Sequence, residues 1–177
     1  MADSIIIREY IPADKNSVME LIRLNTPGYF ASEEEADLSE YLDNKRELYY
    51  VLLYNEKIVG CGGINFADNK TTGKISWDIL HPMYQGKTLG TLLLKYRIEK
   101  LKSIGSIQRI TVRTSQAAYG FYEKQGFVLN EIKKDYWAQM KNPIGKPKNP
   151  NIRRAASMIN PMIDNMLTLI IILLRNR

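Results

Sequence analysis

Cysteine and histidine are almost absent from this sequence. Its 177 residues include one cysteine, Cys61, and one histidine, His81. A single cysteine excludes a disulfide bond within the chain and agrees with a reducing compartment, so we expect a cytoplasmic protein. One histidine and one cysteine cannot build a zinc site, and we therefore expect no metal. The length predicts one domain that is large enough for an apolar core.

Targeting signals and long apolar runs are also missing. The first ten residues, MADSIIIREY, lack a charged region followed by an apolar stretch, so no export signal is visible. The apolar run LTLIIILL at residues 167–174 is too short to span a membrane, which needs about 20 apolar residues. The sequence contains no internal repeat and no low-complexity tract. We expect no membrane partner.

Positive charge is concentrated in the C-terminal part of the chain. Residues 133–177 hold nine Lys or Arg against two Asp or Glu, whereas residues 1–132 hold 16 against 17. Such a region can attract phosphates, nucleic acid or an acidic partner. No fold signature of a nucleic-acid-binding protein accompanies it. A solvated basic loop is therefore the plainer interpretation, and we expect no nucleic acid as a partner.

The most informative stretch is residues 75–91, ISWDILHPMYQGKTLGT. A strand-like run ends before Pro82, and a short loop containing Gly86 and Gly90 opens directly into an apolar helical pattern. A strand that leads through a glycine-containing turn into a helix directs several backbone N–H groups at one point. The positive end of the helix dipole adds to them. This pattern predicts a phosphate-binding loop.

Two common phosphate loops do not fit this stretch. A Walker loop needs a glycine five positions before Gly-Lys-Thr, and for residues 86–88 that position is His81. A dinucleotide fingerprint needs Gly-x-Gly-x-x-Gly after the first strand of a βαβ unit. Neither residues 60–63 (GCGG) nor residues 86–90 have that spacing.

The loop resembles the pyrophosphate loop of the GNAT N-acetyltransferases, which reads Gln/Arg-x-x-Gly-x-Gly/Ala. Gln85 stands at the first position, Gly86 and Lys87 match the Gly-Lys that commonly follows, and Gly90 matches the final glycine. Thr88 replaces the first motif glycine. We expect a negative φ angle at Thr88, which would make its β-carbon harmless. The alternative is that its hydroxyl helps to hold a phosphate oxygen.

A second block strengthens this resemblance. Residues 112–127, VRTSQAAYGFYEKQGF, are similar to the GNAT segment Asn-x-x-Ala-x-x-Phe/Leu-Tyr-Glu-Lys-x-Gly-Phe. The matching residues are Ala118, Phe121, Tyr122, Glu123, Lys124, Gly126 and Phe127. Ser115 stands where asparagine is usual, which puts its bond to the pantetheine arm in question. The resemblance covers about residues 5–142.

The resemblance implies that the protein binds acetyl-coenzyme A and transfers its acetyl group to a primary amine. The implied cofactor-binding residues are Leu80, His81, Gln85, Gly86, Lys87, Thr88, Leu89, Gly90, Thr91, Ser115, Ala118, Tyr122 and Lys124. Tyr122 is the implied general acid, which would protonate the departing thiolate. A phenol with the ordinary pKa of about 10 stays protonated at neutral pH. The alternative is that Tyr122 only walls the thioester pocket.

A base that takes a proton from the amine is harder to assign. Asp78, in the strand before the loop, is the candidate catalytic residue, acting directly or through water. Because strand residues alternate between faces, Asp78 can equally point away from the site. His81 is a weaker candidate, since the family uses this position mainly through its backbone.

The loop between the first two predicted helices is expected to shape the acceptor pocket. Tyr29, Phe30 and Glu33 are the candidate substrate-binding residues. Glu33 and the two glutamates that follow it would attract a cation, or they would form a solvated helix start that the helix dipole stabilises. A small metabolite, an antibiotic and a protein N-terminus all remain open as acceptors.

Hydrophobic periodicity predicts an α/β (α+β) domain with the order βααβββαβαβ and at least one further strand. Strands are predicted at residues 5–7, 48–54, 57–66, 73–80, 107–114 and 127–137, and helices at residues 15–24, 32–44 and 89–104. The resemblance implies a GNAT-type mixed, mostly antiparallel twisted sheet. This sheet would have six to seven strands, flanked by about four helices.

We assign residues 1–142 to the core of the domain and residues 143–177 to an insertion followed by a C-terminal segment. Four Pro and Gly residues between positions 143 and 150 mark a loop. We predict that residues 138–165 form the insertion and that residues 167–174 form the last strand, buried between two others. The alternative is an added helix over residues 155–174 that packs on a partner subunit and makes a homodimer.

A rival hypothesis comes from another class of protein. It is a non-catalytic module that holds coenzyme A, or a regulatory or interaction protein with this fold. Thr88 and Ser115, which both depart from the family pattern, favour the rival. The intact residues 121–124 (FYEK) favour the enzyme.

Overall fold

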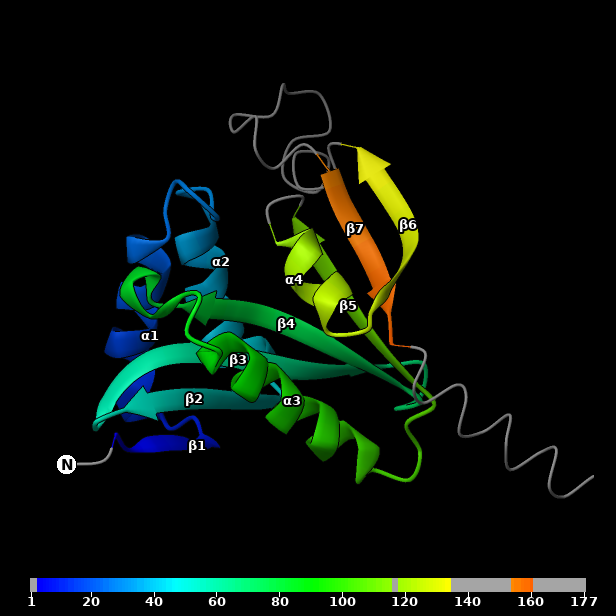
Figure 1. Cartoon of the computed structure of the whole chain (residues 1–177), viewed down its shortest axis with the longest axis horizontal. Coiled ribbons are helices and arrows are strands. Elements are labelled where there is room, and N and C mark those ends of the chain that lie inside the picture. Colours follow the sequence, from blue (N-terminus) through cyan, green and yellow to red (C-terminus); the bar gives the residue numbers. More distant parts are fainter. Residues whose placement is uncertain (1–2, 116–117, 135–153, 161–177) are drawn as a thin grey trace, which may run out of the picture. The chain divides into compact units, whose positions relative to one another are not determined.

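The computed structural model describes residues 3–115, 118–134 and 154–160, which form a mixed α/β fold (Figure 1). Its strands are β1 (Ile5–Glu9), β2 (Leu48–Tyr54), β3 (Lys57–Ala67), β4 (Thr72–Leu80), β5 (Arg109–Ser115), β6 (Val128–Lys134) and β7 (Arg154–Ile159). Its α-helices are α1 (Lys15–Leu24), α2 (Glu34–Glu40), α3 (Leu89–Lys102) and α4 (Tyr119–Lys124). The predicted fold class and element order are confirmed.

The strands form one sheet in the order β1-β2-β3-β4-β5-β7-β6. The pairs β1–β2, β2–β3, β5–β7 and β6–β7 are antiparallel. The chain divides into two compact units. The first unit comprises Met1–Asn65 and Ile75–Glu99, and the second comprises Phe66–Lys74 and Lys100–Arg177.

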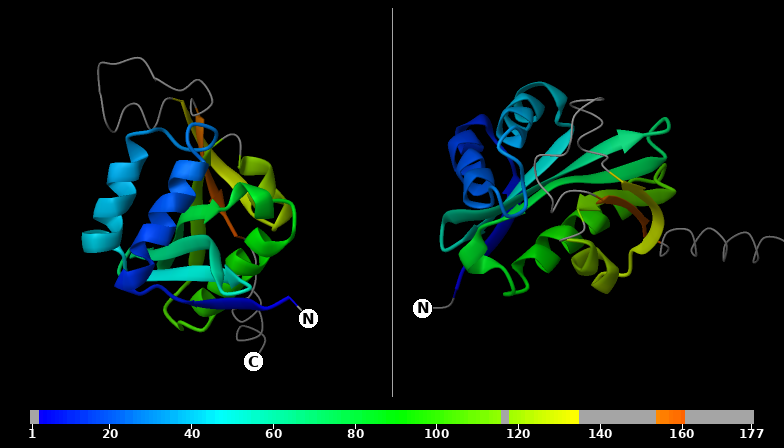
Figure 2. Two further views of the ribbon diagram at one scale, coloured as in Figure 1. Left: turned by 90° about the vertical axis from the view of Figure 1, so that its left-hand side faces the viewer. Right: turned by 90° about the horizontal axis from the view of Figure 1, so that it is seen from above.

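In the first unit, α1 and α2 lie on one face of the strands and α3 lies on the opposite face (Figure 2). Val18, Leu21 and Ile22 of α1 are buried, because they recur at helical spacing and face the strands. The buried core on this face consists of Val18, Met19, Leu21, Ile22, Leu38, Tyr41, Leu42, Tyr49, Val51, Cys61 and Ile79. It fixes the helices to the strands that carry the candidate site.

In the second unit, β7 lies between β5 and β6 and pairs with both. Met158 is fully buried and stands opposite Val112 on one side and Leu129 on the other. Helix α4 ends before Gly126, whose φ of +85° is the left-handed conformation that glycine adopts most easily. Phe127 then turns inward and is buried.

The position of the inserted strand corrects the prediction for the C-terminal part. We predicted an insertion at residues 138–165, or alternatively a helix from residue 155 onward. The structure instead forms β7 over Arg154–Ile159, so both alternatives were wrong for these residues. Ala155 and Ala156 favour helix over strand by intrinsic preference, but hydrogen bonding to a strand on each side outweighs that preference.

Two other expectations about this part lie outside the described residues: the loop at positions 143–150 and the apolar run at 167–174. Within the described ranges, no helix has the length and the apolar character that a bilayer crossing demands.

Candidate active site

The predicted phosphate loop connects β4 to α3. A 3₁₀ turn at Pro82–Tyr84 follows β4, and Gly86 then adopts a φ of +75° that favours glycine. The first hydrogen bond of α3 runs from the Leu92 N–H to the Thr88 carbonyl, at 3.0 Å. Among the described residues, the N–H groups of residues 86–91 donate to no protein acceptor. They can therefore bind an anion at the positive end of the helix.

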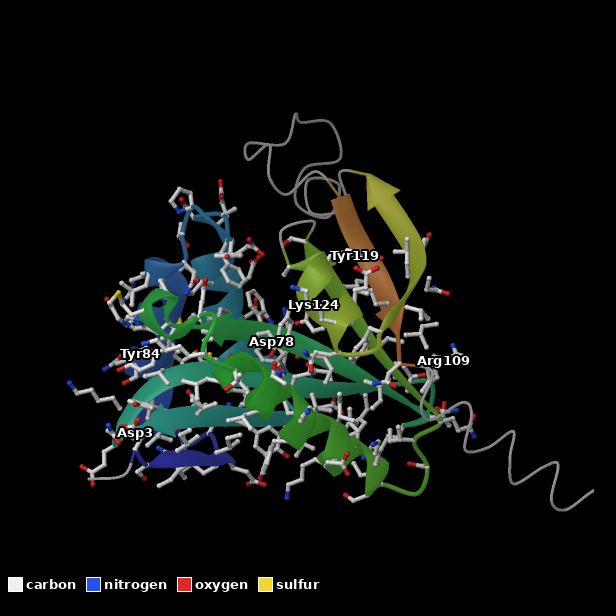
Figure 3. All side chains as sticks on the ribbon, in the orientation of Figure 1. Asp3, Asp78, Tyr84, Arg109, Tyr119 and Lys124 are labelled. Carbon is white, nitrogen blue, oxygen red and sulfur yellow. The ribbon has the colours of Figure 1, made fainter. Side chains whose placement is uncertain are left out.

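Positive charge also lies on this loop. The Lys87 ammonium group is 5.2 Å from the ring centroid of Tyr84, a cation–π contact within the loop itself. Figure 3 shows Tyr84 beside the start of the connection to α3. Lys87 is exposed and belongs to the same loop as the N–H groups of residues 86–91.

Thr88 has a φ of +64°, so the expected negative angle was wrong. A β-branched residue in the left-handed region is strained by roughly 1–2 kcal/mol, because its β-carbon approaches a backbone oxygen. Its hydroxyl donates to the Lys87 carbonyl at 2.5 Å. The loop therefore keeps the backbone conformation of a glycine while it carries a threonine.

The strain at Thr88 gives a testable prediction. Thr88→Gly and Thr88→Ala both lose the hydroxyl, but only alanine keeps a β-carbon in the left-handed region. We expect the free energy of unfolding of the glycine variant to exceed that of the alanine variant by about 0.5–1 kcal/mol. Urea unfolding followed by circular dichroism measures the difference. Equal free energies would mean that the loop relaxes around the β-carbon without strain.

Gln85 braces the loop against the end of α1. Its Nε2 donates to Asn25 Oδ1 at 3.1 Å and to the Leu80 carbonyl at 3.3 Å. The buried Asn25 in turn donates to the carbonyls of Leu80, at 3.0 Å, and Leu21, at 2.8 Å. The sequence analysis missed Asn25. Its position directly after a helical pattern, where asparagine is favoured, was the available signal.

His81 stabilises the turn that precedes the loop. Its N–H donates to the Val59 carbonyl at 2.8 Å, and its carbonyl accepts from the Tyr84 N–H at 2.9 Å. The imidazole Nδ1 accepts from the Met83 N–H at 3.2 Å, so the proton of the neutral ring is on Nε2. These contacts give His81 a structural role, and its part in cofactor binding stays a prediction.

Strand β4 changes its side-chain alternation at Trp77. This residue has a φ of +50°, which is rare for a bulky side chain. Ser76 and Trp77 both contact Tyr41. The Ser76 and Tyr41 hydroxyl oxygens are 3.2 Å apart, and the ring centroids of Trp77 and Tyr41 are 5.9 Å apart. Asp78 binds Arg97 of α3, on the opposite face. Because Ser76 and Asp78 would share a face in a regular strand, Trp77 acts as a β-bulge.

Asp78 is held by a buried guanidinium group. Its Oδ1 accepts from Nη2 of Arg97, and the exposed fractions of the two side chains are 23% and 1%. Figure 3 shows Asp78 on the strand that precedes the loop. The sequence analysis missed Arg97, which occupies a position at helical spacing among buried leucines of α3. The ion pair gives Asp78 a structural role, and its role as a base stays a prediction.

A polar network lies on the α2 side of the strands. Tyr41 donates to Asn65 Oδ1 at 2.7 Å, and Ser76 donates to the same oxygen at 2.9 Å. Asn65 Nδ2 donates to Glu47 at 3.2 Å. Burial raises the pKa of Tyr41, so its hydroxyl keeps its proton at neutral pH. This network has no local sequence signal, because its members come from four separate segments.

The predicted acceptor loop reaches both β4 and the phosphate loop. The ring of Phe30 stacks on Trp77 with 6.3 Å between centroids, and the Tyr29 hydroxyl lies 3.4 Å from Gln85 Oε1. Tyr29 is exposed. Tyr29 therefore lies beside Gln85, a predicted cofactor-binding residue, and Phe30 lies beside Trp77, the neighbour of Asp78 in the chain.

The glutamates at the start of α2 make mainly local contacts. Glu34 accepts from the Ala31 N–H at 2.7 Å, and Glu35 forms an ion pair with Arg23 at 2.7 Å. These contacts favour the interpretation of a locally stabilised helix start. Glu33 is exposed just before α2, and its role in substrate binding stays a prediction.

The second sequence block forms α4 and its flanking residues in the second unit. Ser115 ends β5, and its carbonyl accepts from the Ala118 N–H at 3.1 Å. The Tyr122 ring packs edge-on against Phe121 at 5.0 Å and against Phe127 at 5.7 Å, and only 4% of Tyr122 is exposed. Tyr122 therefore contributes to packing, and both its role as an acid and the alternative that it walls the thioester pocket stay predictions.

Lys124 is exposed on α4, where Figure 3 shows it with Tyr119. The implied cofactor contacts of Ser115, Ala118 and Lys124 stay predictions. Across residues 3–115, 118–134 and 154–160, no three His, Cys, Asp or Glu side chains are grouped so that they could hold a metal ion.

Comparison with known proteins matches this chain to a family. The model of the acetyltransferase (GNAT) family matches residues 16–127. An amino-acid acetyltransferase of Vibrio vulnificus (strain CMCP6) is 29% identical over 128 residues, which are 72% of this chain and 27% of that protein. The chain therefore spans about a quarter of the length of this curated relative.

Solved structures share the fold. The ribosomal-protein-S18-alanine N-acetyltransferase of Escherichia coli has a TM-score of 0.69 at 19% identity, over 88% of this chain and 92% of that chain. A GNAT family acetyltransferase of Elizabethkingia anophelis, solved with acetyl-CoA bound, has a TM-score of 0.63 at 23% identity. That match covers 88% of this chain and 96% of the other. Both likenesses concern the fold alone.

Proposed function

Because this chain belongs to the acetyltransferase (GNAT) family, we propose that it transfers an acetyl group from acetyl-coenzyme A to a primary amine. The reaction is a direct attack of the amine on the thioester in a ternary complex. The observation that carries the proposal is the set of N–H groups at residues 86–91, which donate to no described protein acceptor at the start of α3. A diphosphate is the kind of anion that such N–H groups bind.

The proposed cofactor contacts begin at this loop. The N–H groups of residues 86–91 bind the diphosphate, and the Lys87 ammonium group adds positive charge. Gln85 acts indirectly, since its side chain braces the loop through Asn25. By the family resemblance, Ser115, Ala118 and Lys124 bind other parts of the cofactor, which supplies the thioester.

The proposed chemistry needs a neutral amine and a protonated leaving group. Most of the rate enhancement comes from holding the amine and the thioester together in a reactive geometry. Tyr122 donates a proton as the sulfur departs, a contribution of about 10²–10⁴-fold. Asp78, or a water molecule beside it, takes the proton that the amine loses.

We propose that Tyr29 and Phe30 line the acceptor side. The stacking of Phe30 on Trp77 and the approach of Tyr29 to Gln85 support this placement. The names of two proteins compared above refer to their acetyl acceptors. One is named for an alanine of ribosomal protein S18, and the other is named for an amino acid. Peptide N-termini and free amino acids are therefore the first acceptors to test.

A thiol-release assay tests the proposed function. The protein is incubated with acetyl-coenzyme A and, separately, with amino acids, alanine-initiated peptides, polyamines and aminoglycosides. We expect at least one acceptor to give saturable release of free thiol above the rate without acceptor. Calorimetric binding of coenzyme A without release for any acceptor would instead support the non-catalytic module, which the departures at Thr88 and Ser115 favour. Absence of binding would remove both functions.

The protein's own thiol will not disturb this assay. Cys61 is buried, and burial raises its pKa to about 12, so at pH 8 the native thiol is protonated. In the unfolded chain its pKa returns to about 8.5, and much more thiolate forms. We expect an aromatic disulfide reagent to label native protein at least about 100-fold more slowly than unfolded protein. Fast labelling of the native protein that Cys61→Ser abolishes would contradict this. A reduced, buried cysteine also agrees with the cytoplasmic location that we propose.

A further inference from the structure

Gly62 of β3 leaves room for the side chain of Arg97 to reach the sheet. A β-carbon at this position would lie 2.4 Å from Nη1 of Arg97 and 2.5 Å from Oδ1 of Asp78. Real β-carbons do not approach neighbours so closely. The absence of a side chain at position 62 of β3 therefore lets the guanidinium group of Arg97 approach β3 and reach Asp78 on β4.

Arg97 connects three elements of the first unit. Its Nε donates to the Leu93 carbonyl of α3 at 3.2 Å, and its Nη1 donates to the Gly63 carbonyl of β3 at 3.2 Å. Its Nη2 donates to Asp78 of β4. A fully buried charge is tolerated only when it is paired and hydrogen-bonded, and these contacts meet that condition. The fork of Arg97 thus joins α3 to both strands.

The partner on β4 directly follows the bulge. Ser76, on one side of Trp77, is bonded to Asn65 and Tyr41 on the α2 face. Asp78, on the other side, is bonded to Arg97 on the α3 face. Because the two anchors lie on opposite faces, the residue between them cannot keep the regular strand conformation. The left-handed backbone of Trp77 follows from these two anchors.

We propose that Arg97 is a positioning residue that holds the bulge at Trp77 through Asp78. Arg97 lies on α3, and the predicted phosphate loop leads directly into the start of this helix. Through Asp78, Arg97 therefore fixes the position of the loop relative to β4, which we call the offset. In the acetyl transfer under "Proposed function", on which this inference rests, that offset decides where the bound thioester meets the amine. A displacement of about 1 Å in such a geometry costs about 100-fold in rate.

Trp77 itself reports on the bulge. The chain has two tryptophans, so a Trp137→Phe background leaves Trp77 as the sole one. In this background we compare Arg97→Met, which removes the charge and the fork, with Arg97→Lys, which keeps the charge alone. Lys15→Met is the matched control, because Lys15 also forms an ion pair from a helix, but its partner, Asp43 at 2.6 Å, is not on β4.

We expect Arg97→Met to change the near-UV circular dichroism of Trp77 and to raise its acrylamide quenching constant about twofold. We expect kcat at saturating acetyl-coenzyme A to fall at least about tenfold, while its Kd changes less than about threefold. Arg97→Lys should give intermediate values of kcat and quenching, and Lys15→Met should change neither. If Arg97→Met does not fold, Arg97→Lys carries both measurements.

The Trp77 signal tests whether Arg97 holds the bulge, and kcat tests whether Arg97 positions the reactants. An unchanged Trp77 signal in folded Arg97→Met overturns the proposed hold on the bulge, whether or not the protein is an enzyme. A changed Trp77 signal with an unchanged kcat overturns the positioning role. A kcat that falls only in proportion to the folded fraction also overturns it. If the wild-type protein releases no thiol, the proposed function fails and with it the catalytic part of this inference, whereas the hold on the bulge is still decided by Trp77.

Discussion

Replacement of Tyr122 by phenylalanine will lower kcat for acetyl transfer by about 100-fold or more. A positioned proton donor contributes about 10²–10⁴-fold, and phenylalanine cannot donate a proton to the departing sulfur. Phenylalanine keeps the ring that packs against Phe121 and Phe127, so the fold and the Kd for coenzyme A should change little. Steady-state kinetics with the best acceptor and calorimetry with coenzyme A measure the two effects.

Tyr119→Phe is the matched control for this prediction. Tyr119 lies one turn earlier on α4, and its hydroxyl donates to Glu123 at 3.2 Å. We expect its removal to change kcat less than about twofold, because an exposed hydrogen bond contributes little. If Tyr122→Phe turns over as fast as wild-type protein, Tyr122 only walls the pocket, and water or another donor protonates the sulfur.

Replacement of Gly62 by alanine will lower the free energy of unfolding by about 3 kcal/mol. The new β-carbon would lie 2.4 Å from Nη1 of Arg97, so the guanidinium group must move away from Asp78 or from β3. Overpacking costs about 1–3 kcal/mol, and separating a buried ion pair costs about 3–5 kcal/mol. Because the arginine side chain can relax, neither cost is met in full, and we expect a total loss of about 3 kcal/mol. Guanidinium unfolding measures it.

Gly105→Ala is the matched control, because a β-carbon there has no neighbour within 4 Å. We expect it to change the free energy of unfolding by less than about 0.5 kcal/mol. The Gly62→Ala, Arg97→Ala double variant should lose less unfolding free energy than the two single variants lose together. The reason is that Arg97→Ala removes the side chain with which the new β-carbon clashes. Equal unfolding free energies of Gly62→Ala and Gly105→Ala would show that Arg97 moves away from the new β-carbon without a cost in stability.

Local sequence patterns predicted the elements well where one periodicity dominates. The bounds of β2 and α1 agree with the prediction, because β2 is a run of aromatic and branched residues and α1 repeats its apolar residues at helical spacing. The glycine turn from β4 into α3 was also predictable. Its glycine at position 86 takes the positive φ that such a turn needs, and the turn leads directly into a helix.

The support of the site was not predictable, because it consists of bonds between distant residues. Asn25 and Gln85 are 60 positions apart, and Asp78 and Arg97 are 19 positions apart on elements of different type. The left-handed conformation of Trp77 has no local signal, since tryptophan does not favour it. Thr88 misled for the opposite reason. Its intrinsic preference predicted a negative φ, and the closure of the loop outweighed that preference.

The place of β7 determines when the second unit is completed during synthesis. Strands β5 and β6 both precede residues 154–159 in the chain, and both need β7 as their antiparallel partner. Without β7, each strand presents an open edge of N–H and carbonyl groups to other chains. A chain truncated before residue 154 therefore has two unpaired strand edges, a feature that favours aggregation.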